Sequence, residues 1–132
     1  MPLVLPVFIQ VKFILETGIK TIHEKENLLL ERFITGISEI KGINLYGTIS
    51  NTERVAVCSF NINGLSPSDT ALLLDENYGI LTRPGLHCAP SAHHTIGTFP
   101  EGTNRISMGY FNTLDEVDTA IRALYELSNN KK

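Results

Sequence analysis

Two N-terminal segments have hydrophobic patterns of different kinds. Residues 3–16 are apolar on nearly every side, which is typical of a helix buried from several directions. Residues 19–40 carry a single apolar stripe at helical spacing, made of Ile22, Leu29, Phe33, Ile37 and Ile40. The pattern predicts two consecutive helices separated at Thr17-Gly18. Because the first has surplus apolar surface, we expect the chain to associate as a dimer or other oligomer.

Short alternating stretches further along predict strands. In residues 54–62 both alternating sets of side chains contain apolar residues, so we expect both faces of this strand to be buried. The other strands are expected at residues 43–46, 78–83 and 103–110.

Two motifs mark the starts of later helices. Ser66-Pro67-Ser68-Asp69 resembles a capping box with proline in the first turn and predicts a helix to about Glu76. Thr113-Leu114-Asp115-Glu116 is a second capping box, opening a helix with an apolar stripe. Residues 84–102 predict a long loop with room for one helical turn, and residues 128–132 a polar tail.

This order of elements indicates an α+β fold. A chain of 132 residues is long enough for one domain with its own core. We expect a small mixed or antiparallel sheet with helices packed on one face. The other face would be covered by loops or by another domain.

The composition narrows the functional classes. Hydrophobic residues make up 42% and charged residues 19%, as in globular proteins. The net charge is −3 and no basic cluster stands out, so nucleic acid and membrane are not expected partners. Two cysteines provide no disulfide framework. The apolar N-terminal stretch, interrupted by Pro6, Gln10 and Lys12, resembles neither a signal peptide nor a membrane span. We therefore expect a cytoplasmic protein.

The segment from Arg83 to His94 concentrates reactive side chains. It contains Cys88, three histidines and Arg83, with prolines and a glycine that indicate an irregular surface loop. A thiol attacks as thiolate, and cationic neighbours such as Arg83 or a protonated His87 would favour that form. Cys88 is therefore a candidate nucleophile, the alternative being an inert buried cysteine.

Other groups allow competing interpretations. His87, Cys88, His93 and His94 could hold zinc, although no second Cys/His pair has the spacing of a zinc site. Cys58 lies in a strand on the side shared with Phe60 and is expected in the core. Arg105 could bind a carboxylate beside the loop, or lie at the rim with its head in solvent.

A family resemblance rests on several elements in one order. Two motifs are similar to the C-terminal signature of class V aminotransferase-fold cysteine desulfurases and selenocysteine lyases. They are Arg83-x-Gly85-x-His87-Cys88-Ala89 and, after it, Arg105-x-Ser107-x-x-Tyr110-Phe111-Asn112-Thr113. The upstream segments also fit the family. Its linking helices resemble Phe13–Glu16 and the long helix after it, and its first small-domain strand resembles Gly42–Gly47. The resemblance covers nearly the whole chain but about the last third of a family member.

The resemblance implies specific roles. Cys88 would attack the substrate sulfur, Arg105 would bind the substrate carboxylate, and His87 and Arg83 would shape the loop. The complete enzyme would use pyridoxal 5'-phosphate as an electron sink. His93 and His94 match no catalytic position of the family.

The resemblance also implies what this chain lacks. Its lysines stand in no strand context suited to a cofactor Schiff base, and no phosphate-cradling glycine loop is present. We therefore expect a single domain over 1–132, with linking helices at 1–41, a small α/β domain at 42–132 and an active-site loop at 83–102.

The large cofactor-binding domain would be absent and supplied in trans or by a full-length protein, and the chain alone would be inactive. A sulfur-acceptor protein is a further expected partner. Two alternatives stay open: a stand-alone persulfide carrier or binding domain, and a fragment of a sister class V aminotransferase.

Overall fold

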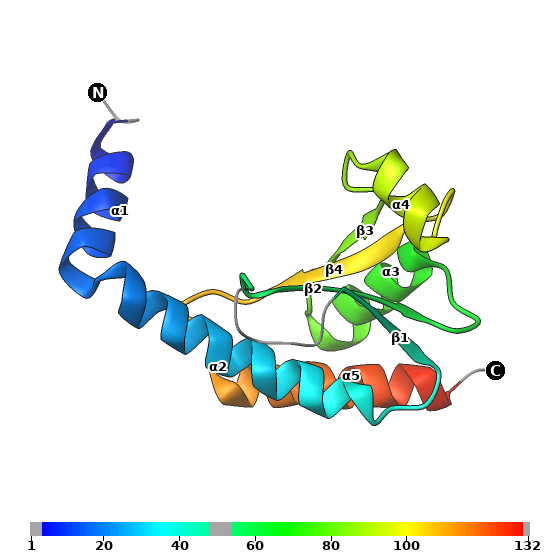
Figure 1. Ribbon diagram of the computed structural model, residues 1–132. Helices are drawn as coiled ribbons and strands as arrows, with labels where there is room; N and C mark the ends of the chain where they lie inside the picture. Colours follow the sequence, from blue (N-terminus) through cyan, green and yellow to red (C-terminus); the bar gives the residue numbers. More distant parts are fainter. Residues whose placement is uncertain (1–3, 48–53, 131–132) are drawn as a thin grey trace.

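The computed structural model describes residues 4–47 and 54–130 (Figure 1). Two helices come first, α1 (Val4–Thr17) and α2 (Ile19–Ser38), followed by strands β1 (Ile43–Tyr46) and β2 (Val57–Ile62). The remaining elements are α3 (Pro67–Tyr78), β3 (Arg83–Gly85), α4 (Pro90–Ile96), β4 (Thr103–Ser107) and α5 (Leu114–Asn129). None of the described helices combines the length and the hydrophobicity needed to cross a membrane.

The four strands form one antiparallel sheet in the order β1-β2-β4-β3. Figure 1 shows α2 and α5 side by side on one side of the sheet and α4 on the other. This confirms the α+β class and the antiparallel sheet.

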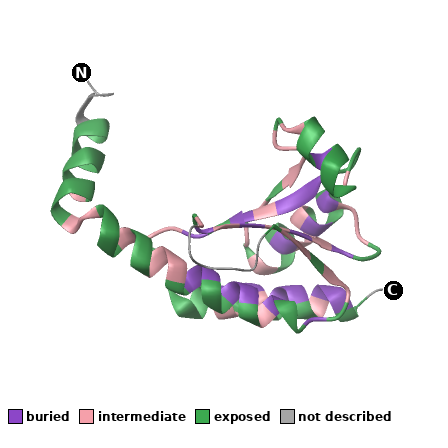
Figure 2. Cartoon of the chain, in the orientation of Figure 1, coloured by how far each residue is buried: buried purple, intermediate pink, exposed green. Residues whose placement is uncertain are grey.

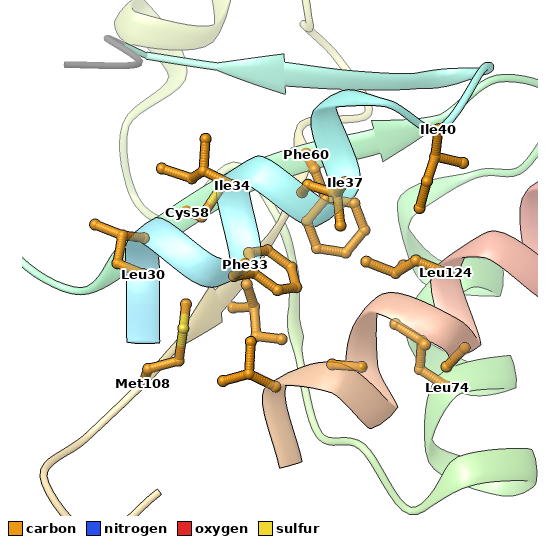
Figure 3. Packing of buried hydrophobic residues seen from close by; sticks show 14 of the residues in the cluster. Leu30, Phe33, Ile34, Ile37, Ile40, Cys58, Phe60, Leu74, Met108 and Leu124 are labelled. Carbon is orange, nitrogen blue, oxygen red and sulfur yellow. The ribbon is translucent and has the colours of Figure 1, made fainter. Parts of the chain in front are cut away.

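The core lies between the sheet and its helices (Figures 2 and 3). Phe33 of α2 meets Phe60 of β2 edge to face, with ring centroids 6.5 Å apart. Leu124 of α5 and Leu74 of α3 complete the apolar cluster, and both are almost fully buried. The stripe predicted on residues 19–40 is confirmed in its main part, since Leu29, Phe33 and Ile37 are buried on α2.

The strand β2 has one buried face, which corrects the expectation of two. Cys58, Phe60 and Ile62 are buried, while Val57, Ser59 and Asn61, which alternate with them, are partly exposed. The strand also begins at Val57 rather than Arg54. The N–H of Val57 bonds to the carbonyl of Val55 at 2.7 Å, so a tight turn stands where the strand was predicted to begin.

The boundaries around β3 also differ from the sequence prediction. Tyr78 ends α3 instead of opening a strand, because Gly79 adopts a left-handed conformation and the N–H of Ile80 bonds to the carbonyl of Leu74. The strand begins at Arg83, where the prediction ended it, and β4 stops at Ser107 rather than Tyr110. The expected helical turn in 84–102 is α4, and α5 extends to Asn129 into the predicted polar tail.

The helix starts follow the capping signals. Ser66 accepts a hydrogen bond from the N–H of Asp69 at 3.0 Å. Thr113 and Glu116 form a full capping box at α5. Hydrogen bonds donated by the Asn112 side-chain amide and by the Thr113 N–H lower the pKa of the Glu116 carboxyl.

The helix α1 projects from the body of the fold (Figure 1). Phe13 packs on Tyr110 and Phe111 with ring centroids 5.5 and 5.2 Å away, which ties α1 to the segment after β4. Most other apolar side chains of α1 are exposed, namely Val7, Phe8, Ile9, Val11, Ile14 and Leu15.

Candidate functional site

The face of the sheet opposite α2 and α5 carries two arginines in register. Arg83 of β3 pairs directly with Arg105 of β4, and Ser59 of β2 pairs with Arg105 on the other side. Residues directly opposite each other in an antiparallel ladder project from the same face. Since Asn104 and Ile106 are buried toward the helices, Arg105 and its two partners project from the open face.

The two guanidinium groups have no anionic partner in the described part of the chain. Neither Arg83 nor Arg105 makes a salt bridge or side-chain hydrogen bond among residues 4–47 and 54–130. Like charges directly opposite in a sheet repel each other. The arrangement is therefore suited to an anion such as a carboxylate, which a guanidinium binds through two parallel hydrogen bonds.

Cys88 stands close by on an exposed turn. The turn follows β3 directly and lies on the same side of the sheet as α4 (Figure 1). Both His87 and Cys88 have positive φ, at 53° and 59°. The N–H of Ala89 bonds to the carbonyl of Leu86 at 2.9 Å and closes the turn. The thiol of Cys88 is exposed, so the inert buried cysteine is not the state of this residue.

The backbone beneath this turn is tightly packed. A Cβ on Gly102 would collide with the backbone carbonyl of Gly85, so no other residue fits there. Next to it, Thr103 is 1% exposed and its hydroxyl has no hydrogen-bond partner in the described structure. Thr103 pairs with Gly85, which places this unpaired hydroxyl at the foot of the turn.

The three histidines of the segment each have a different principal contact. His87 hydrogen-bonds through Nε2 to the Arg83 carbonyl at 2.7 Å. His93 is buried and bonds through Nδ1 to the hydroxyl of Thr98, also at 2.7 Å. His94 stacks on Phe99. No group of three ligands among the described residues is placed to hold a metal ion, so the zinc interpretation has no support here.

The second cysteine has a different environment. Cys58 is 1% exposed within the core, as predicted, and burial raises the pKa of its thiol to about 11 despite the opposing charge of Arg54. A thiol with so high a pKa is almost wholly protonated near neutral pH and is a poor nucleophile. The two cysteines are therefore chemically distinct.

A cavity of about 440 Å³ lies elsewhere, between the end of α3, β4 and the start of α5. It is lined by Phe33, Tyr78, Met108 and Asp115 among others. Cys88, Arg83 and Arg105 are not part of its wall. These three residues stand on an open surface instead.

The described residues do not suit pyridoxal phosphate by themselves. Lys12 and Lys20 pair with glutamates on their own helices, at 3.7 Å each. Lys25 lies over the ring of Tyr110, and Lys41 follows α2. No described lysine therefore belongs to the sheet face that carries Arg83 and Arg105.

Sequence reasoning missed parts of this site. It singled out Cys88, Arg105, His87 and Arg83, and the structure brings all four to the β3–β4 end of the molecule. It did not identify Ser59, although its alternation with Cys58 and Phe60 was a usable signal. It also could not place the unpaired hydroxyl of Thr103.

Comparison with known proteins identifies the family of this chain. Residues 8–120 match the family Aminotransferase class-V. A probable cysteine desulfurase of Methanothermobacter thermautotrophicus is 37% identical over 112 residues, which cover 84% of this chain and 28% of that protein. A probable cysteine desulfurase of Pyrococcus abyssi is 36% identical over 117 residues, which cover 89% of this chain and 28% of that protein. The chain thus spans little more than a quarter of the length of these relatives.

Solved structures show the same fold. The apo structure of a cysteine desulfurase from Thermococcus onnurineus has a TM-score of 0.85 and 32% identity, covering 92% of this chain and 29% of that one. The cysteine desulfurase CsdA from Escherichia coli shares the fold, with a TM-score of 0.76 and 24% identity. The match covers 88% of this chain and 28% of that one. The fold of this chain is therefore that of a class V domain. This chain belongs to the aminotransferase class-V family.

Proposed function

We propose that this chain is the C-terminal small domain of a pyridoxal-phosphate-dependent cysteine desulfurase, with linking helices at 1–41, the small domain at 42–132 and its active-site loop at 83–102. The observation that carries the proposal is an exposed thiol, Cys88, on the turn that follows β3, the strand in which Arg83 pairs with Arg105 of β4. The matched relatives named as probable cysteine desulfurases support the same activity.

Each residue has a defined part in the proposed reaction. Arg105 binds the α-carboxylate of cysteine through a bidentate pair, and Arg83 adds positive charge beside it. Cys88 attacks the substrate sulfur as a thiolate, so a sulfur–sulfur bond forms while the carbon–sulfur bond breaks. The products are a persulfide on Cys88 and alanine.

The cofactor belongs, in this proposal, to the larger remainder of the enzyme. When bound there, it supplies the electron sink for carbon–sulfur cleavage. The described lysines of this chain are engaged on helices or lie away from the sheet face, which supports assigning the Schiff base elsewhere. The chain alone is then inactive and needs the large domain in trans or in the same polypeptide.

The test is reconstitution. The chain is co-expressed with the part of the Methanothermobacter thermautotrophicus relative that precedes the matched region, and supplied with pyridoxal phosphate and cysteine. We expect mass spectrometry to find one added sulfur atom on Cys88, lost in Cys88→Ala and kept in Cys58→Ala. Arg105→Lys should raise KM at least tenfold, since Lys cannot form the bidentate pair. Alanine release that persists in Cys88→Ala would refute the role of Cys88 and favour a sister aminotransferase.

A carrier role is the second candidate, favoured by the exposure of Cys88 and by the lack of a suitable lysine on the sheet face among residues 4–47 and 54–130. A carrier accepts a persulfide sulfur from a donor protein by thiol exchange and passes it to an acceptor protein. It would acquire sulfur from an intact cysteine desulfurase without any large-domain partner. The reconstitution separates the enzyme-fragment role from the carrier role, because the enzyme fragment must form a complex with the large domain before Cys88 receives sulfur.

Self-association is a further part of the proposal. The exposed apolar side chains of α1, among them Phe8 and Leu15, form a surface that water solvates poorly. We propose that, when the large domain is not present, this surface binds the same surface of a second copy of the chain.

A further inference from the structure

The turn that carries Cys88 has an unusual backbone. Leu86, His87, Cys88 and Ala89 form a turn closed by the Ala89 N–H to Leu86 carbonyl bond, with both central residues in the left-handed region. This is the pattern of a type I′ turn, in which glycine, asparagine and aspartate normally fill the central positions. Here a histidine and a cysteine fill them. Such residues persist in strained conformations only where the surroundings hold them.

One side-chain contact ties the turn to the sheet. The ring Nε2 of His87 lies 2.7 Å from the backbone carbonyl of Arg83, the first residue of β3. A carbonyl only accepts, so Nε2 carries the hydrogen and donates it. The bond therefore fixes the position of the ring relative to the strand that carries one of the two unpaired arginines.

The ring of His87 also lies near a second, firmly held ring. The ring centroid of His93 is 5.9 Å from that of His87. His93 is buried and is itself held by Thr98, so it limits how far the His87 ring can swing. The imidazole of His87 is thus placed between the start of β3 and α4.

We propose that His87 is a positioning residue for Cys88, which holds the left-handed turn closed and so aims the thiol at the face carrying Arg83 and Arg105. This rests on the proposed role of Cys88 as nucleophile. Attack of sulfur on sulfur needs the thiolate in line with the bond that breaks, so orientation matters as much as exposure. Without the bond to Arg83 the strained turn relaxes and the thiol samples other directions.

The experiment compares variants that separate backbone preference from hydrogen bonding. Asn tolerates the left-handed region but is too short to reach the Arg83 carbonyl, whereas Gln restores an N–H of similar reach. The variants are His87→Asn, His87→Gln and, as the matched control on the same segment, His94→Asn, each made in Cys58→Ala. The readouts are hydrogen exchange of the Ala89 amide by NMR and the spectrum of a nitroxide label on Cys88.

We expect exchange of the Ala89 amide to accelerate about five- to tenfold in His87→Asn, as loss of one net hydrogen bond implies. In the same variant the spectrum of the nitroxide label on Cys88 should change from one ordered component to a mixture of an ordered and a mobile component. His87→Gln should return both readouts part of the way, and His94→Asn should leave them unchanged. The melting temperature serves to show that all variants are folded.

Wild-type exchange and label spectra in a folded His87→Asn would overturn the proposal. The same conclusion would follow if the ring-nitrogen shifts of His87 showed Nε2 without a proton. These readouts need neither cofactor nor substrate. A reconstituted enzyme that forms no persulfide would therefore refute the proposed function while leaving the positioning role of His87 intact.

Discussion

Arg83 and Arg105 are direct cross-strand partners, so two guanidinium groups project side by side from the open face of the sheet. No described acidic group neutralises them. A like-charged cross-strand pair destabilises a sheet by about 0.2–1 kcal/mol. The folded domain keeps this repulsion, which an anionic ligand would remove.

The first prediction follows from that repulsion. Arg83→Gln should increase the free energy of unfolding by a few tenths of a kcal/mol at low ionic strength. The gain should shrink as salt screens the pair. Urea unfolding at two salt concentrations measures both effects. Lys41→Gln removes an equal charge away from the pair and serves as control; an equal gain in that variant would show that net charge, not the pair, is responsible.

The second prediction concerns the buried thiol. An unfolded thiol ionises near pH 9.0, whereas burial raises the pKa of Cys58 to about 11 in the folded state. Between these values the unfolded state releases a proton that the folded state retains, so the free energy of unfolding falls as pH rises. The loss should reach about 2–3 kcal/mol by pH 11.

Cys58→Ala has no thiol to ionise at this position. The variant is less stable than the wild type at every pH, because removing the buried sulfur atom of Cys58 leaves a small cavity in the core. The comparison therefore uses the slope between pH 9 and 11, which should be shallower in the variant. Parallel slopes in the two proteins would contradict the raised pKa of Cys58.

How far the sequence led can be judged from particular elements. The stripe on 19–40 and the capping boxes at Ser66 and Thr113 predicted helices that the structure contains, because these signals are local. The strand expected at 78–83 was wrong. Its apolar residues suited a strand, but the left-handed Gly79 extends α3 to Tyr78 and shifts the strand to Arg83.

The sequence proposed candidate site residues but could not predict how they are arranged. The family signature identified Cys88, Arg105, His87 and Arg83. Register depends on which strands become neighbours, so the direct pairing of Arg83 with Arg105 could not be derived from spacing. The left-handed turn had no sequence signal either, since neither His87 nor Cys88 is a residue that usually marks such a turn.

The third prediction tests the unpaired hydroxyl at the foot of the turn. Thr103→Val replaces a buried hydroxyl without a partner by a methyl group of the same shape, so the free energy of unfolding should rise by about 1 kcal/mol. The matched control is Thr70→Val. Thr70 is equally buried, but its hydroxyl donates to the carbonyl of Ser66 at 2.9 Å.

The two threonine variants should therefore move in opposite directions, with Thr70→Val losing about 1 kcal/mol. Thermal or urea unfolding measures both. A loss in Thr103→Val comparable to that in Thr70→Val would mean that the hydroxyl of Thr103 is hydrogen-bonded in solution, for instance to a water molecule.

The fourth prediction concerns self-association through α1. Leu15 is 78% exposed on a helix whose other apolar side chains are also mostly exposed, so a charge there should disrupt an interface between two copies. Leu15→Glu should shift the chain from dimer or higher oligomer to monomer in light scattering, with little change in stability, because most of the Leu15 side chain is exposed in the single chain. Leu81→Glu is the matched control, since Leu81 is 79% exposed but follows α3 rather than lying on α1. A wild-type chain that is monomeric at high concentration, or a Leu81 variant that dissociates equally, would rule out α1 as the contact.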